Sequence, residues 1–355
     1  MAIINELKWQ VLTPVVNNMR SPNQALRRFL FPDNTIDPQP TEDIVIDQLT
    51  GGRECAPFVR KNGEAILVGG YGTKSTTIAG PNIRIKRPFT PSELLFGRQP
   101  GTTPIVTGIG QVMSAVQAHI TRDLQWMENL IVNTEELLVA QCLQGVMSYS
   151  QDDGDVFTIT LPKPAANNIT LTTFWNDATP SNVRVLTDIH AVKRVLSEIG
   201  FGATDAICGS EAASQLIQLA ETGALKFLDQ RAVNGGFLDF TRQFDEDGLI
   251  YMGQLGGINF WEYSRTATLN GVSQNMVRPK YVEFVNRNAD ASGRRLYYAA
   301  IPDMTAFQGG KCQAKRFSKA WLTEDPSAWN ALIHSRPLPW FRRADTTVSV
   351  KVISG

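Results

Sequence analysis

The sequence predicts an α+β fold organised around one long helix. Three observations support this prediction. Apolar residues recur every three or four positions across residues 112–146, which is the spacing of a buried helix face. Apolar and polar residues alternate in residues 83–86, which is typical of a strand. Helical and strand-like segments then follow one another across residues 184–302, as they do in a compact α+β unit.

Length and composition limit the class of protein. The chain has 355 residues, of which 43% are hydrophobic, so two or more domains with sizeable cores are expected. Lys and Arg together number 34, as do Asp and Glu, which argues against a general nucleic-acid-binding protein. Four widely separated cysteines without a C-x-x-C pair indicate reduced thiols and no zinc. With no membrane-length apolar run and no secretory signal pattern, we expect an intracellular protein without a membrane partner.

The chain begins with a segment that we expect to form an extended arm, residues 1–52. Its loose tract FPDNTIDPQPTED contains three prolines, and the apolar density is too low for a separate domain. Such a segment is expected to lie along another part of the protein or its assembly.

A long β-hairpin is predicted next, within residues 53–90. Strand-like runs around residues 58–59 with 65–68, and around residues 82–86, flank a tip rich in Gly, Ser and Thr. A hairpin with so few bulky apolar residues is marginal in isolation. We therefore expect it to pack against another part of the chain or against another subunit.

The predicted long helix follows at about residues 112–146. Its apolar stripe steps through Met113, Val116, Ile120, Leu124, Met127 and Ile131. No proline interrupts the stripe, and Gly145 offers a stop near its end. At about 1.5 Å per residue the helix would be roughly 50 Å long, which suggests an elongated molecule with a spine. An ordinary long core helix is the alternative, and the segments on either side favour the spine.

Further strands are expected in the middle region and in the tail. In the middle region they fall at residues 205–208, 249–253, 258–263, 281–285 and 296–301, with a Gly256-Gly257 turn between the second and third. The tail closes on the strand-like run TTVSVKVI. We expect this last strand to return to the domain of the spine.

The sequence contains no constellation that indicates catalysis. His119 and Asp123 lie one helical turn apart, which predicts a surface contact, and no third ligand suggests a metal. Glu135 and Glu136 are predicted to lie on a solvated helix face. The stretch GGYGTKS lacks the glycines of a phosphate loop, and no serine elbow accompanies a histidine. We therefore expect no enzyme activity, no cofactor and no metal.

Two stretches carry a resemblance to a known family. The first lies in the predicted hairpin and runs from APFV through NGE and GG to GPNIRIKRPFTP. The second lies in the tail and contains Trp321, Thr323, Asp325-Pro326, IHSRPLP and VSVKV. In this order the chain resembles the tailed-phage major capsid proteins, and more narrowly the lambda-type major capsid protein E family. The resemblance extends over the whole chain in the order of its elements.

The resemblance implies the Hong Kong 97-like phage capsid fold with four parts. These would be an N-terminal arm (1–52), an extended loop (53–90), a peripheral domain with the spine helix (91–183 and 303–355) and an axial domain (184–302). The implied function is that of a major capsid protein of the virion, self-assembling into hexamers and pentamers of an icosahedral head around double-stranded DNA. Assembly would take place in the host bacterial cytoplasm.

The resemblance also implies partners. Because the arm begins almost at Met1, a separate scaffolding protein is expected, together with a portal protein and a possible decoration protein at the three-fold positions. The balanced charge predicts only weak, sequence-independent contact with the packaged DNA. Two alternatives stay open, an encapsulin-like compartment shell protein and an α+β enzyme with an unrecognised site.

Five residues of the predicted loop are candidates for intersubunit contact. Arg84, Lys86 and Arg87 are expected to contact acidic groups of adjacent subunits, and Lys74 and Phe58 are further candidates. The alternative is a solvated strand face, because exposed ion pairs contribute only ~0–1 kcal/mol each.

Overall fold

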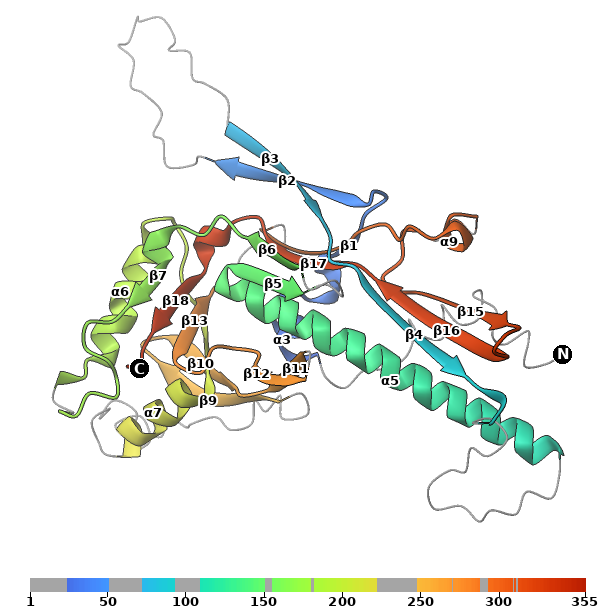
Figure 1. The fold of residues 1–355 in the computed structure, drawn as a ribbon. Coiled ribbons are helices and arrows are strands. Elements are labelled where there is room, and N and C mark those ends of the chain that lie inside the picture. The colour runs from blue at the N-terminus through green and yellow to red at the C-terminus, as the bar shows by residue number, and fades with distance from the viewer. Residues whose placement is uncertain are drawn as a thin grey trace, which may run out of the picture.

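The computed structural model describes residues 24–50, 72–92, 109–150, 155–179, 182–221, 248–269, 271–287, 293–308, 310 and 312–355. Its longest element is helix α5 (Ile109–Gln144) with 36 residues, as the apolar period predicts. The helix stops at Gly145, whose φ of 92° is easily adopted by glycine. Figure 1 shows α5 extending from the body of the molecule as a rod.

A three-stranded antiparallel sheet lies along the N-terminal half of α5. Its order is β15-β16-β4, with β4 (Ile83–Phe89), β15 (Phe317–Thr323) and β16 (Ala328–Ser335). Phe89 and Ile333 are buried against Leu124, Met127 and Ile131 of the helix. The run predicted as the second hairpin strand therefore pairs with a strand of the tail. The reason is that its alternating isoleucines find their apolar partner on the spine helix.

A six-stranded sheet forms the second unit, in the order β7-β18-β13-β8-β10-β9. Its strands are β7 (Asn168–Thr170), β8 (Asp205–Cys208), β9 (Leu249–Leu255), β10 (Ile258–Tyr263), β13 (Tyr281–Val285) and β18 (Val348–Lys351). Helices α6 (Val185–Ser197) and α7 (Ser210–Glu221) contribute to the core on one face.

The last strand, β18, is inserted between β7 and β13. The expectation that it returns to the spine was wrong. Val348 and Val350 are buried in the core beneath α6 and α7, so the apolar side chains of this strand are covered within the six-stranded sheet. The tail does reach the spine helix earlier, through β16 and β17 (Pro337–Phe341).

A third sheet joins the two units, in the order β1-β14-β17, with β1 (Ile36–Pro38) and β14 (Arg294–Tyr298). The strand expected at 296–301 is thus β14, and it belongs to this sheet and not to the middle unit. Helix α3 (Ala25–Leu30) of the predicted arm packs beside it, with Leu26, Leu30 and Phe31 fully buried. The described part of the arm therefore packs on its own chain.

The remaining strands form two-stranded ribbons. The longest pairs β2 (Asp43–Thr50) with β3 (Gly72–Ala79). This ribbon takes the place of the predicted long hairpin. Its first strand lies in the predicted arm, and its second strand ends before the predicted second strand begins. The runs at 58–59 and 65–68 lie outside the described residues. The other short elements are β5 (Val146–Ser150), β6 (Val156–Thr160), β11 (Thr266–Leu269), β12 (Val272–Asn275), α9 (Met304–Gln308), η1 (Asp33–Thr35), η2 (Ala165–Asn167) and η5 (Ala344–Thr346).

Candidate intersubunit contact site

The β2–β3 ribbon leaves the body as an isolated pair of strands (Figure 1). One face of its root is anchored, because Ile44 and Ile46 are buried in the central core. Glu42, just before β2, pairs with Arg336 at 3.0 Å between Oε1 and Nη1. The opposite face is open, and Val45 on it is 59% exposed. Two strands with one open face bury too little to be stable alone, so this face is suited to contact with another chain.

The arm is fixed to the spine by Glu136. Its Oε1 accepts the backbone N–H of Leu26 at 2.6 Å and the hydroxyl of Tyr263 at 2.8 Å, and its Oε2 accepts the N–H of Arg27 at 3.0 Å. These amides belong to the first turn of α3, where the helix has no internal acceptors. Burial raises the pKa of Glu136, and the three donors oppose that rise. One carboxylate thus joins the arm, the spine and strand β10.

A second buried cluster joins the spine to the tail. Arg316, fully buried, donates from Nη1 and Nη2 to the carboxylate of Glu135 at 2.6 and 2.8 Å, and from Nε to Glu128 at 3.0 Å. Tyr298 donates its hydroxyl to Glu135. Burial alone would raise the pKa of Glu135, but the Arg316 guanidinium outweighs it and holds the pKa below its usual value. For Glu128 burial prevails and the pKa is raised.

The prediction that Glu135 and Glu136 form a solvated helix face was wrong. They are 2% and 0% exposed, because each meets donors from elements far away in the sequence. Glu128 and Glu135 are seven residues apart and lie on one helix face. This spacing could have predicted that the two carboxylates share a cation.

The five candidate contact residues lie in different environments. Arg84 and Lys86 are exposed on the outward face of β4, and Nζ of Lys86 lies 5.5 Å from the ring centre of Trp321. Lys74 lies in β3 opposite Gln48 in the strand register. Phe58 lies outside the described residues. The structure therefore brings Arg84 and Lys86 together on one surface.

Arg87 faces the spine helix. Its Nε donates to Oδ2 of Asp123 at 2.8 Å, and Nδ1 of His119 lies 3.2 Å from the same oxygen. The predicted contact between His119 and Asp123 is present, but it is not a surface contact, because the two side chains are only 16% and 13% exposed. Arg87 is its third member. Arg87 thus has its acidic partner within its own chain.

His334 contributes no cation to the outward face at neutral pH. It lies on β16 opposite Arg84, with Nε2 2.5 Å from Oδ1 of Asn82. Burial lowers the pKa of His334 to about 4, and the cations of Arg84 and Arg336 lower it in the same direction. The imidazole is therefore a neutral partner of Asn82 near pH 7.

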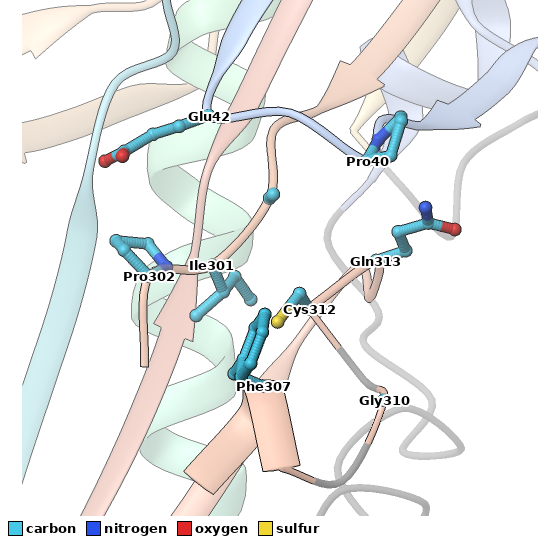
Figure 2. A pocket seen from close by; sticks show the side chains of 9 residues that line it. Pro40, Glu42, Ile301, Pro302, Phe307, Gly310, Cys312 and Gln313 are labelled. Atoms are coloured by element: carbon cyan, nitrogen blue, oxygen red, sulfur yellow. The ribbon is translucent and has the colours of Figure 1, made fainter. Parts of the chain in front are cut away.

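An open hollow of about 520 Å³ lies at the root of the ribbon. Figure 2 shows Ile301, Phe307 and Cys312 grouped on one side of it, with Pro40 and Glu42 on the other. Its one carboxylate, Glu42, already pairs with Arg336, so the hollow has no set of groups poised for acid–base chemistry. Within the described ranges no three His, Cys, Asp or Glu side chains are placed to hold a metal ion. No described helix is long and apolar enough to cross a membrane.

Sequence reasoning gave no role to Lys319, which belongs to the same surface as Lys86. Both pair with Leu332 of β16, one on each side, so their side chains share a face of the sheet. The alternation Phe317, Lys319, Trp321 in the sequence was a usable signal for this face. This alternation does not indicate that β16 lies between β15 and β4.

Comparison with known proteins gives one family. Residues 8–352 match the family model described as phage major capsid protein E. No curated protein sequence matches the chain.

Among solved structures, the putative capsid protein of a prophage of E. coli CFT073 superposes with a TM-score of 0.72, at 18% identity, over 98% of this chain and 99% of that chain. The capsid of Cyanophage A-1(L) gives 0.49 at 12% identity over 95% of each chain. The SrpI encapsulin of Synechococcus elongatus PCC 7942 gives 0.44 at 8% identity over 95% and 92%. The first of these shows that the two chains share their fold from end to end.

Proposed function

The chain belongs to the family of phage major capsid protein E, and from this premise we propose that its copies assemble as hexamers and pentamers into an icosahedral head. The chain has the Hong Kong 97-like fold of phage capsid subunits. The single observation that carries the assembly proposal is the β2–β3 ribbon, anchored at Ile44 and Ile46 but open on its other face. A neighbouring copy would cover this open face, which two strands alone do not bury.

We further propose a structural role without catalysis, in a head that encloses double-stranded DNA and assembles in the bacterial cytoplasm. The described hollow and charge clusters support this, since their carboxylates are occupied by Arg316, Arg336 and backbone amides. A scaffolding protein, a portal protein and a decoration protein are proposed as partners. Contact with DNA is proposed to be weak and independent of sequence, because the chain carries no net charge.

For the parts of the molecule, we propose an axial domain within 184–302 that excludes β14 and is completed by β7 and β18, and a peripheral domain around α5 and β15-β16-β4. The sheet pairings support this division. The extended loop is proposed to comprise the whole β2–β3 ribbon, with Arg84 and Lys86 on the peripheral surface.

Electron microscopy of the expressed protein tests the assembly proposal. The full chain is purified with and without co-expression of the scaffolding gene from the same genome, and is analysed by sedimentation velocity and negative staining. Closed shells of uniform size are expected in at least one condition. A folded chain that stays a monomer or small oligomer in both conditions contradicts the proposal.

A further inference from the structure

Two buried N–H groups without a hydrogen-bond acceptor lie side by side on the sheet that joins the two units of the molecule. They are Nε1 of Trp340 on β17 and Nε of Arg295 on β14. Arg295 and Trp340 are paired across the two strands, so their side chains project from the same face of the sheet, with Cβ atoms about 5 Å apart. Native proteins leave few buried donors unpaired, so two at neighbouring positions indicate an acceptor from outside the chain.

The surroundings of Arg295 differ from those of other arginines with an unpaired Nε. Arg27, Arg278 and Arg336 each reach a carboxylate through another guanidinium nitrogen. In the described part of the chain the side chain of Arg295 takes part in no ion pair and no hydrogen bond. Its positive charge therefore has no partner on its own chain among the described residues.

A second guanidinium group extends over the same face. Arg342 follows β17, and its backbone N–H donates to the carbonyl oxygen of Gly293. Its Nε donates to the hydroxyl oxygen of Tyr297 at 3.3 Å. Tyr297 lies two residues beyond Arg295 on β14, on the same face of the sheet. The side chain of Arg342 therefore crosses the Arg295–Trp340 pair, and no ion pair among the described residues holds it.

These four side chains lead from solvent into the interior. Arg342 is exposed and Arg295 half-buried, whereas Trp340 and Tyr297 are only 1% and 3% exposed. The acidic residue nearest in the strand register is Asp37 of β1, opposite Tyr297, and it forms an ion pair with neither arginine. We call Arg295, Tyr297, Trp340 and Arg342 the junction donor set.

The chemistry of the junction donor set selects an oxyanion. Guanidinium groups bind phosphate with two parallel hydrogen bonds, and the four oxygens of a tetrahedral ion leave acceptors for further donors. The indole of Trp340 donates only, and the hydroxyl of Tyr297, which accepts from Arg342, still has its own proton to donate. A phosphodiester of duplex DNA could contact the exposed Arg342, but an indole that is 1% exposed is accessible only to a small ion.

We propose that the junction donor set binds a free inorganic oxyanion of the phosphate class. Its charge lies between the guanidinium groups of Arg295 and Arg342, and one of its oxygens accepts the indole N–H of Trp340. The ion joins β14 to β17, which belong to the sheet between the two units (Figure 1). Binding does not require assembly into shells, so its failure would leave the proposed function untouched.

Isothermal titration calorimetry of the full unassembled chain with inorganic phosphate tests the site, at fixed pH and with ionic strength held constant by chloride. One ion per chain is expected. Arg295→Gln and Arg342→Gln should each weaken phosphate binding at least about tenfold, because each removes charged hydrogen bonds. The matched control is Arg343→Gln, whose guanidinium already pairs with Asp345, and it should keep the wild-type affinity.

Two further measurements separate the site from a general effect of charge. Trp340→Phe keeps an aromatic ring but removes the N–H, and should weaken phosphate binding about two- to tenfold. Phosphate should raise the Tm of the wild type, since a ligand bound only by the folded chain stabilises it. That rise should be absent in Arg342→Gln, and circular dichroism checks that each variant is folded.

The inference is overturned if phosphate binds no better than chloride, or if the two arginine variants bind it as the wild type does. Acetate that binds as tightly as phosphate would indicate a carboxylate site and would also overturn it. A short DNA duplex that requires Arg295 and Arg342 for binding, while free phosphate does not bind, would assign these arginines to phosphodiesters and overturn the site for a free ion.

Discussion

Arg316 illustrates how a buried charge holds distant segments together at the scale of a residue. Its guanidinium satisfies Glu128 and Glu135 from the tail of the chain. Removing one member of a buried ion cluster leaves an uncompensated charge, which is far more costly than losing a solvated pair.

We predict that Arg316→Met destabilises the unassembled subunit by about 3–5 kcal/mol, because two carboxylates then remain buried without their cation. Urea denaturation measures the change. The control is Arg343→Met, which breaks a partly exposed pair with Asp345 and is expected to cost no more than about 1 kcal/mol. Equal losses in the two variants contradict the role given to Arg316.

His334 makes the fold sensitive to acid. Its pKa is lowered to about 4 in the folded chain, and an unfolded histidine titrates near 6.5. Between these values the unfolded chain binds more protons, so stability falls as the pH drops from about 6.5 to 4, by up to about 3 kcal/mol. Below pH 4 both states are protonated, and this histidine adds no further change.

Denaturation at several pH values between 7 and 4 measures this loss. His334→Gln is expected to flatten the profile, because it removes the titrating group. His190→Gln, on an exposed face of α6, is the matched control and should keep the wild-type profile. A His334→Gln profile as steep as the wild type would refute the assignment.

At the scale of elements, Glu136 couples helix α3 to α5 and β10. We predict that Glu136→Gln weakens the attachment of the arm, because the side-chain amide presents a donor where the carboxylate accepted one. Leaving a buried donor unpaired costs about 1–3 kcal/mol, so the amides of Leu26 and Arg27 should exchange roughly 5–150-fold faster.

Hydrogen exchange read by mass spectrometry checks this prediction. Exchange in α6, remote from the arm, should stay at the wild-type rate. Glu211→Gln, on the exposed side of α7, should leave both regions unchanged. Unaltered exchange in α3 after Glu136→Gln would show that the carboxylate does not hold the arm.

The elements that the sequence predicts well are those with local causes. Helix α5 follows from its uninterrupted apolar period and Gly145. The β9–β10 hairpin follows from two alternating runs about Gly256-Gly257, and both glycines have positive φ. These signals lie within a few residues of the elements that they specify.

Such local signals do not indicate which strands pair or which charged side chains become buried. Nothing near Ile83 indicates that β4 pairs with β16, and nothing near Val348 indicates a place between β7 and β13. Glu136 reads as a surface residue until the first turn of α3 is placed against it. Each of these depends on contacts between residues more than 60 positions apart, where period and composition give no partner.

At the scale of the whole molecule, the balanced charge bears on the packaged genome. We predict weak binding of duplex DNA by the unassembled subunit, with affinity that falls steeply as salt increases and varies little with sequence. Fluorescence anisotropy with two unrelated duplexes over a series of salt concentrations measures this. Tight binding that resists salt and prefers one duplex would contradict the prediction.

The central claim is that the β2–β3 ribbon becomes buried only between copies. The most direct test is a cryo-electron microscopy map of the assembled particle, at a resolution that traces each chain. We predict that the open face of the ribbon in every copy lies against a different copy. A map in which each ribbon contacts only its own subunit, with shells held together by other surfaces, would contradict the account.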